Sequence, residues 1–123
     1  MRNVNYIRKR RDFIQVGLDV FIYREDDQYI AYAPALDIFG YGNTTDDAKN
    51  AFAEELEIYL DHTIKKHTLE QDLKNLGWKK RSNKKSDFES PNIEEIKKKS
   101  LLLLNIDQNN LVESFKKDTA IAV

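Results

Sequence analysis

The sequence contains no cysteine, which excludes several classes of protein at once. Without thiols the chain cannot be a disulfide-stapled scaffold, a cysteine-dependent enzyme, a zinc ribbon or an iron–sulfur protein. Long apolar runs are also missing, since the four leucines at 101–104 fall far short of the roughly 20 residues that span a bilayer. The basic N-terminus lacks the apolar stretch of a signal peptide. We therefore expect a cytoplasmic protein without a membrane segment and, at 123 residues, a single domain.

The net charge of −1 conceals an uneven distribution of 20 basic and 21 acidic residues. Residues 1–12 sum to +4 and residues 77–86 to +5, whereas residues 13–76 sum to −8 and residues 87–123 to −2. An acidic body suits a basic partner, because complementary fields speed encounter and disfavour wrong partners. The alternative is that these acids form an ordinary solvated surface.

Residues 13–42 carry the pattern of a small antiparallel sheet. From 13 to 23 the residues alternate strictly, which predicts a strand with one aliphatic face, made of Ile14, Val16, Leu18, Val20 and Ile22. A polar turn at 25–28 and a second short strand at 29–33 complete a hairpin, which Pro34 ends. Residues 36–41 add a third strand. The sequence thus predicts a three-stranded antiparallel meander.

Helical patterns follow the meander. Thr44 is a suitable N-cap for a long helix whose apolar positions recur every three or four residues, so one face packs on the sheet. Thr68 begins a capping box for a shorter helix that Gly77 closes, with Trp78 folding back on it. Ser90 and Pro91 are the expected start of a helix over about 92–103. After it, residues 111–115 suggest one more helical turn and residues 119–123 a terminal strand.

These elements predict an α+β fold: a three-stranded antiparallel meander packed by one long helix, with a short helix and a helical C-terminal extension. Residues 1–78 form the core with a basic N-terminal arm. Residues 79–123 form a flexible basic connection, over 79–87, and an extension of the same domain.

Aromatic residues gather on the face of the meander opposite the aliphatic one. Alternation places Phe21 with Tyr23 on this second face, and it places Phe39 with Tyr41 on one face of the third strand. One long helix covers only one face of a sheet, so if these four residues share a face they form an apolar surface that needs another cover. Residues 93–123, a second copy of the chain and a partner protein are all possible covers.

Signatures of catalysis are weak. His62 and His67 are five residues apart and so do not share a helical face as a metal-binding pair would. Three aspartates, Asp19, Asp37 and Asp47, could gather around a divalent metal as in nucleases, but Asp47 is explained more simply by the first turn of the long helix. We expect no enzyme, no metal and no cofactor.

Two basic segments support an alternative function. The first comprises Arg8, Lys9, Arg10 and Arg11, and the second spans 79–85 and begins with Lys79, Lys80 and Arg81. Such clusters bind phosphates; Tyr6 lies near the first segment, and Trp78 beside the second could stack on a base. A nucleic-acid-binding module is therefore the second hypothesis; clusters of this size are also common as solvated ends and linkers.

Residues 29–48 resemble the core of the HicB-like antitoxin family, and the similarity extends over about residues 13–77. The family has a strand that ends in Pro-x-Leu and, after a third strand, the motif Gly-x-Thr-x-x-(Glu/Asp)-Ala at the start of a long helix. The matching residues here are Pro34, Leu36, Gly42, Thr44, Asp47 and Ala48. Two features depart from the family: a Pro-Gly-Cys segment is replaced by residues 37–40, and residues 79–123 show no helix-turn-helix or ribbon-helix-helix pattern.

The resemblance implies a partial ribonuclease-H-like fold without catalytic machinery. It also implies an antitoxin that binds a small basic toxin of the HicA type, blocks its cleavage of messenger RNA, and forms a homodimer or higher homo-oligomer. Neutralisation would be steric and electrostatic. From charge and periodicity, the candidate partner contacts are the hairpin acids Glu25, Asp26 and Asp27 and the helix acids Glu54, Glu57 and Asp61. Phe21, Tyr23, Phe39 and Tyr41 would supply the apolar centre of an interface or of self-association.

Overall fold

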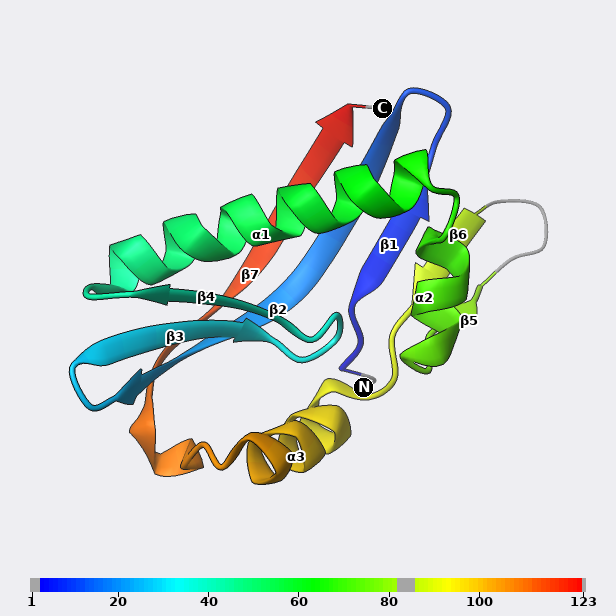
Figure 1. The fold of residues 1–123 in the computed structure, drawn as a ribbon. Helices are drawn as coiled ribbons and strands as arrows, with labels where there is room; N and C mark the ends of the chain where they lie inside the picture. The colour runs from blue at the N-terminus through cyan, green and yellow to red at the C-terminus, as the bar shows by residue number, and fades with distance from the viewer. Residues whose placement is uncertain (1–2, 82–85, 123) are drawn as a thin grey trace.

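The computed structural model describes residues 3–81 and 86–122, and these form an α+β fold (Figure 1). The predicted class is therefore confirmed. Within these residues, seven strands form one antiparallel sheet, accompanied by three helices and one 3₁₀ turn. In chain order the elements are β1 (Tyr6–Lys9), β2 (Phe13–Glu25), β3 (Gln28–Ala33), β4 (Ile38–Gly42), α1 (Thr45–Lys65), α2 (Leu69–Asn75), β5 (Lys79–Lys80), β6 (Ser86–Glu89), α3 (Ile93–Leu104), the 3₁₀ turn (Gln108–Asn110) and β7 (Leu111–Ala122). Among the described residues, no helix has both the length and the apolar character needed to cross a membrane.

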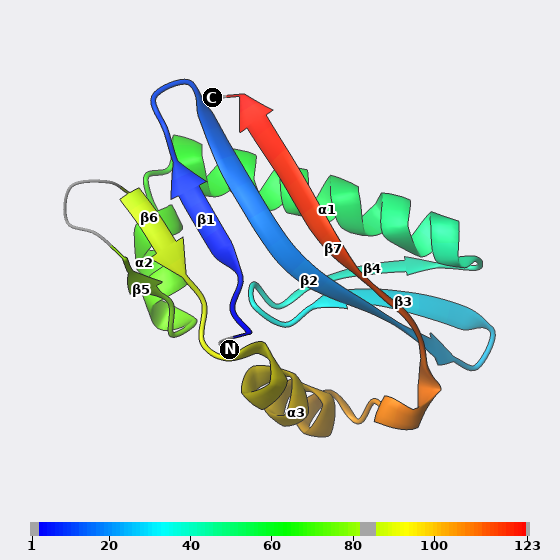
Figure 2. The same ribbon diagram turned by 180° about the vertical axis from the view of Figure 1, so that it is seen from behind.

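The long strand β2 organises the sheet. Along one edge it pairs with β7 from Phe13 to Tyr23 (Figure 2). Its other edge is shared, because β1 pairs with residues 14–17 and β3 with residues 21–25. The sheet therefore divides into two arms, β1-β6-β5 and β3-β4. The strands β2, β3 and β4 pair in sequence order, and the sheet extends well beyond them.

Helix α1 covers the aliphatic face of β2. The even-numbered residues of β2 from Ile14 to Ile22 are buried, as are Ala48, Phe52, Leu56 and Leu60 on the facing side of α1. Thr44 caps the helix as predicted, because its Oγ1 accepts a hydrogen bond from the amide of Asp47 at 3.0 Å. The approach of α1 to β4 is very close: a Cβ atom added at Gly40 would lie 2.2 Å from the backbone nitrogen of Phe52.

The second face of the sheet is covered in part by α3. Phe21 and Tyr23 are only 7% and 1% exposed, and Lys97 of α3 places its Nζ 4.4 Å from the centroid of the Phe21 ring. Burial, with Glu94 nearby, raises the pKa of Tyr23 to about 12. The C-terminal segment is thus the cover for these two residues, and the expectation that they lie on an exposed surface is wrong. Alternation along β2 could not show what packs above it.

Two predictions for the C-terminal region are also wrong. Residues 79–80 and 86–87 of the expected flexible connection belong to β5 and β6, which extend the sheet from β1, so the β1 part of the basic N-terminal arm lies inside the sheet between β2 and β6. Residues 82–85 of this connection, which include Lys84 and Lys85, lie outside the described residues. The expected helical turn at 111–115 is instead the start of β7, because the long free edge of β2 offers backbone partners as far as Tyr23. The terminal strand is present as the end of β7.

The helix ends follow the predictions only partly. Gly77 adopts a φ of 88°, and Trp78 folds back so that its indole N–H donates to the carbonyl oxygen of Ala35 at 2.8 Å. Thr68, however, makes no side-chain capping bond for α2, so the predicted capping box is wrong.

The start of α3 also differs from the prediction, because its N-cap is Asn92 rather than Ser90. The hydroxyl oxygen of Ser90 is already engaged: it accepts the amide hydrogen of Asn5 at 2.8 Å. Asn92 accepts instead from the first amides of the helix, at 3.0 Å from Glu94. The N-cap therefore lies two residues after the predicted one, and Ser90 instead forms a long-range hydrogen bond with Asn5.

The close approach of α1 to β4 gives a stability prediction. Gly40→Ala is expected to lower the free energy of unfolding by about 2 to 3 kcal/mol, because the new methyl group meets helix backbone that cannot move aside alone. Gly17→Ala is the matched control, because the methyl group there meets the ring of Tyr6, a side chain that can rotate, and should cost about 1 kcal/mol or less. Urea unfolding monitored by circular dichroism measures both variants. Equal losses of unfolding free energy in Gly40→Ala and Gly17→Ala would contradict the close backbone contact between α1 and β4.

Candidate functional site

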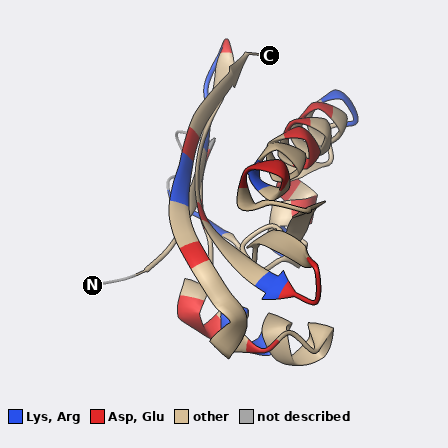
Figure 3. Cartoon of the chain, turned by 90° about the vertical axis from the view of Figure 1, so that its left-hand side faces the viewer, with Lys and Arg blue, Asp and Glu red and all other residues tan. Residues whose placement is uncertain are grey.

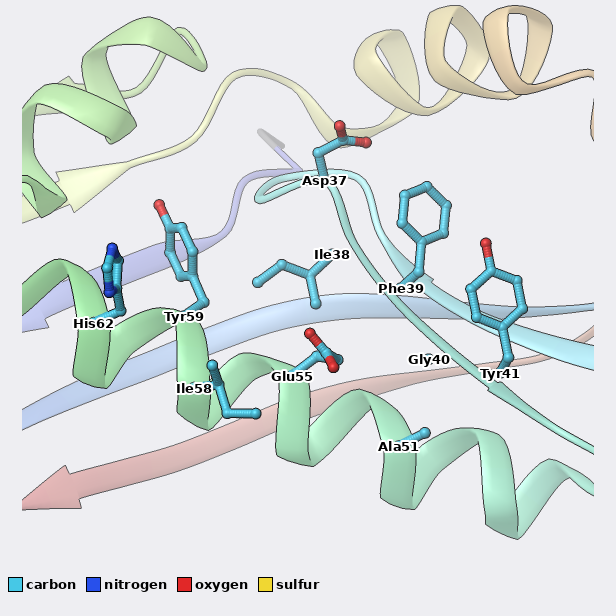
Figure 4. A pocket seen from close by; sticks show the side chains of 10 residues that line it. All are labelled: Asp37, Ile38, Phe39, Gly40, Tyr41, Ala51, Glu55, Ile58, Tyr59 and His62. Atoms are coloured by element: carbon cyan, nitrogen blue, oxygen red, sulfur yellow. The ribbon is translucent and has the colours of Figure 1, made fainter.

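An open groove of about 700 Å³ runs between β4 and α1 (Figure 4). One wall is apolar and aromatic and the other belongs to the outer side of the helix. Its lining includes Ile38, Phe39 and Tyr41 from β4, and Glu55, Ile58 and His62 from α1. Because β4 is the last strand of its arm in the described structure, the groove gives access to the edge of the sheet.

The β4 side of the groove carries a stack of aromatic rings, which lies on the sheet face that points away from α1 (Figure 4). Phe39 and Tyr41 lie on the same face of β4, as alternation predicted, and their ring centroids are 6.2 Å apart. Phe39 also stacks on the buried ring of Tyr32 at 4.5 Å. Tyr41 is 55% exposed, and across the groove Ile58 is 61% exposed. Two large apolar side chains therefore face solvent beside a rigid aromatic base, an arrangement typical of a contact surface.

The outer side of α1 is acidic. Glu54, Glu57 and Asp61 are exposed at three- and four-residue spacing, as the sequence predicted (Figure 3). Within the described residues, Glu54 and Glu57 make no ion pair, whereas Asp61 pairs with Lys65 at 3.1 Å. The structure adds Glu55, which sequence reasoning missed and which lines the groove. Its role depends on where β4 lies relative to α1, a tertiary feature that periodicity does not contain.

The acids of the hairpin form a separate group. Asp26 and Asp27 make the two-residue turn between β2 and β3, where Asp26 adopts a φ of 51°, and Glu25 pairs with Gln28 in the last position of the ladder. Figure 3 shows this turn apart from the acidic stretches of α1. The structure therefore does not combine the two predicted acidic groups into one surface.

The two basic segments are brought close together by β6, which pairs with both β1 and β5. Acids of β6 offset part of the basic charge, because Arg10 forms an ion pair with Asp87 and Arg81 forms one with Glu89 at 3.3 Å. Helix α2 supplies a third acid, Glu70, which pairs with Lys80 at 3.3 Å. Lys9, Arg11 and Lys79 are exposed.

Strand geometry further divides the first basic segment. Arg8 and Lys9 are successive residues of β1, so they project from opposite faces of the sheet. Arg8 lies over the ring of Tyr6, with its guanidinium carbon 4.3 Å from the ring centroid. Trp78 is buried, so the expectation that its ring stacks on a base is wrong.

The aspartates considered for a metal site have separate surroundings. Asp19 accepts a hydrogen bond from the side-chain amide of Asn5 at 2.8 Å, and Asp37 accepts one from the hydroxyl of Tyr32 at 2.9 Å. Asp47 lies in the first turn of α1. In residues 3–81 and 86–122, no group of three or more His, Asp or Glu side chains is arranged to hold a metal ion.

A second exposed apolar group lies at the end of α3. Leu102 and Leu103 are 83% and 87% exposed, whereas Leu101 is buried. Sequence reasoning did not single out this group, although four consecutive leucines turn around a helix and cannot all face one core.

Comparison of the chain with protein-family models, curated proteins and solved structures gives no match. The resemblance to the HicB-like family therefore remains an expectation based on residues 29–48.

The groove also gives a pH prediction through Tyr59, which lies on its α1 side. Burial, with Asp72 nearby, raises the pKa of Tyr59 to about 12. In the unfolded chain this hydroxyl releases its proton near pH 10, so between pH 10 and about 12 it is protonated in the folded state and ionised in the unfolded state. The stability that its burial contributes is therefore fully present below pH 10 and is lost as the pH rises through about 12. In urea unfolding between pH 9 and 12, the free energy of unfolding of Tyr59→Phe should fall less steeply with pH than that of the parent chain. Parallel curves would contradict the burial of this hydroxyl.

Proposed function

We propose that the chain is a non-enzymatic protein-binding domain that binds a small basic protein. The observation that carries this proposal is the outer side of α1, where Glu54, Glu55 and Glu57 are exposed without ion pairs from the described residues. Glu55 lines the groove, whereas Glu57 lies on the side of the helix toward β7. Helix α1 as a whole bears six acidic and two basic residues. An interface with an apolar centre and a charged rim fits this surface, since Tyr41 and Ile58 are exposed next to the acids.

We further propose that the basic partner is an mRNA interferase of the HicA type. The resemblance over residues 29–48 supplies this identity, and the acidic surface supports it. A protein that binds RNA carries a basic surface for phosphates. Docking of an acidic helix on that surface offsets its charge and covers it, so RNA is excluded without any chemical step. On this proposal the domain acts in the cytoplasm, as a homodimer or higher homo-oligomer.

The same proposal includes a partial ribonuclease-H-like core. The pairing of β2, β3 and β4 in sequence order, with α1 packed directly after β4, supports the partial ribonuclease-H-like core that the resemblance implies. The remaining strands and α3 are then additions of this chain to that core.

A nucleic-acid-binding module is the second candidate. The feature in its favour is the position of β6, which brings residues 8–11 and 79–81 into neighbouring strands. The ion pairs of Arg10, Lys80 and Arg81 weigh against it, because these charges are already offset. This candidate predicts RNA or DNA binding that weakens steeply with salt and is lost when Lys9, Arg11 and Lys79 are neutralised.

The antitoxin proposal predicts that a HicA-type toxin encoded in the source genome arrests growth when expressed alone and is neutralised by this chain. The double variant Glu54→Lys/Glu57→Lys should fail to restore growth and should bind the toxin at least about tenfold more weakly, because it places positive charge against a basic surface. Growth rescue and isothermal calorimetry on purified proteins measure the two effects.

The matched control is Asp12→Lys/Glu95→Lys, which makes the same change in charge at two exposed positions away from α1. This control should rescue growth as the parent chain does. Equal failure of both double variants would indicate a general charge effect and refute the α1 surface. A parent chain that neither binds the toxin nor rescues growth would refute the antitoxin role, and light scattering on the same samples measures the oligomeric state.

A further inference from the structure

The edges of the sheet are protected unequally. Unpaired edges attract other strands, and proteins usually guard them with charged residues, proline or very short strands. In the described structure three strands end the sheet. β7 carries Lys116, Lys117 and Asp118 at its centre, and β5 consists of two lysines. β4, with the sequence Ile-Phe-Gly-Tyr-Gly, has no charge and no proline. Among the strands that the structure describes, the unguarded edge is therefore that of β4, which lines the groove.

The groove provides more than a row of backbone groups. In an antiparallel sheet alternate residues of an edge strand direct N–H and C=O away from their partner, so β4 offers hydrogen bonds along the groove. A strand added there would place alternate side chains on the two faces of the sheet. On one face they would meet Phe39 and Tyr41, and on the other they would meet α1 (Figure 4).

Gly40 gives the α1 side a definite chemistry. Its missing side chain lets the α1 backbone at Ala48 and Phe52 lie against β4, and Ala51 and Glu55 of the same helix line the groove beside it. A side chain of an added strand opposite Gly40 would thus point toward the Glu55 carboxylate, with Ile58 one turn away. Lysine or arginine fits this position, because its apolar stem can lie on Ile58 while its charge meets Glu55.

The charge of α1 disfavours a second copy of the chain as the strand that pairs with the β4 edge. Pairing of β4 with β4 of another molecule would bring two α1 helices side by side, since each helix packs directly on its own β4. Each helix carries six acids and two lysines, so identical helices repel each other. A basic partner has the opposite charge and gains from the same arrangement.

We infer that the open edge of β4 binds an extended segment of the basic partner as an additional strand. Main-chain hydrogen bonds to β4 hold the segment, its apolar side chains pack on Phe39 and Tyr41, and on the other face a lysine or arginine lays its stem on Ile58 and meets Glu55. Peptide addition to a sheet edge is a known mode of recognition in which the backbone gives affinity and alternate side chains give specificity. The inference rests on the proposed function for the basic nature of the partner.

A designed peptide tests this inference without the partner. The probe is the capped hexapeptide acetyl-Val-Lys-Val-Lys-Val-Lys-amide, titrated into the ¹⁵N-labelled chain. We expect saturable shifts and slowed amide exchange in residues 38–42, with smaller changes along β7. The peptide with glutamate in place of lysine should bind at least tenfold more weakly, because it faces Glu55 and the other acids of α1.

Two variants and a matched control locate the binding site. Tyr41→Lys and Ile58→Lys alter exposed side chains of the groove, so both variants should fold normally. Each should lower the affinity for the lysine peptide at least fivefold. Val112→Lys is the control, because Val112 is 52% exposed and lies on another edge strand, and it should leave binding unchanged. Glu55→Lys should reverse the preference between the two peptides.

The outcomes separate this inference from the proposed function. Absence of binding to β4, protection of β7 instead, or equal affinity for the two peptides would overturn the inference. Concentration-dependent protection of β4 in the chain alone would also overturn it and would make a second copy the occupant. Peptide binding at β4 without toxin rescue would keep the inference about the edge and refute the antitoxin role, whereas toxin rescue in Tyr41→Lys and Ile58→Lys would keep that role and refute strand addition.

Discussion

The backbone-to-backbone contact between α1 and β4 is the constraint on which the rest of the arrangement depends. At Gly40 even one methyl group would meet the amide of Phe52 and the carbonyl of Ala48. Contact this close fixes the helix directly above the last strand of its arm, so one side of α1 is buried and the other adjoins the strand edge. The groove, its aromatic wall and the position of Glu55 follow from this placement.

The C-terminal third of the chain completes this core. α3 covers Phe21 and Tyr23 on the second face, and β7 fills the full free edge of β2. Both elements cover surface that would otherwise attract other chains, because buried aromatic rings and paired strand edges are no longer available for contacts. In the described residues the β3-β4 arm then keeps one open edge, and that edge lies beside the most acidic helix.

The sequence predicted local features well because their causes are local. The alternation of β2, the cap at Thr44 and the exposure of Glu54, Glu57 and Asp61 depend on residues within one or two turns. β7 was misjudged at its start because its partner is β2, about 90 residues earlier in the chain. The basic segments were misjudged for the same reason: β6 pairs with β1 across the sequence and brings Asp87 to Arg10. Glu55 was missed because its importance comes from β4, which periodicity along α1 cannot reveal.

An uncharged edge strand is normally a hazard, and the acidic helix beside it offers a physical solution. Strand addition through main-chain bonds tolerates many sequences, so affinity at such an edge does not by itself select a partner. Selection has to come from the surroundings, and repulsion between identical α1 helices disfavours pairing of one copy with another at β4. A basic partner removes that repulsion and gains the same backbone bonds. On the proposed function, the charge that attracts the toxin is therefore also the charge that leaves the edge free to receive it.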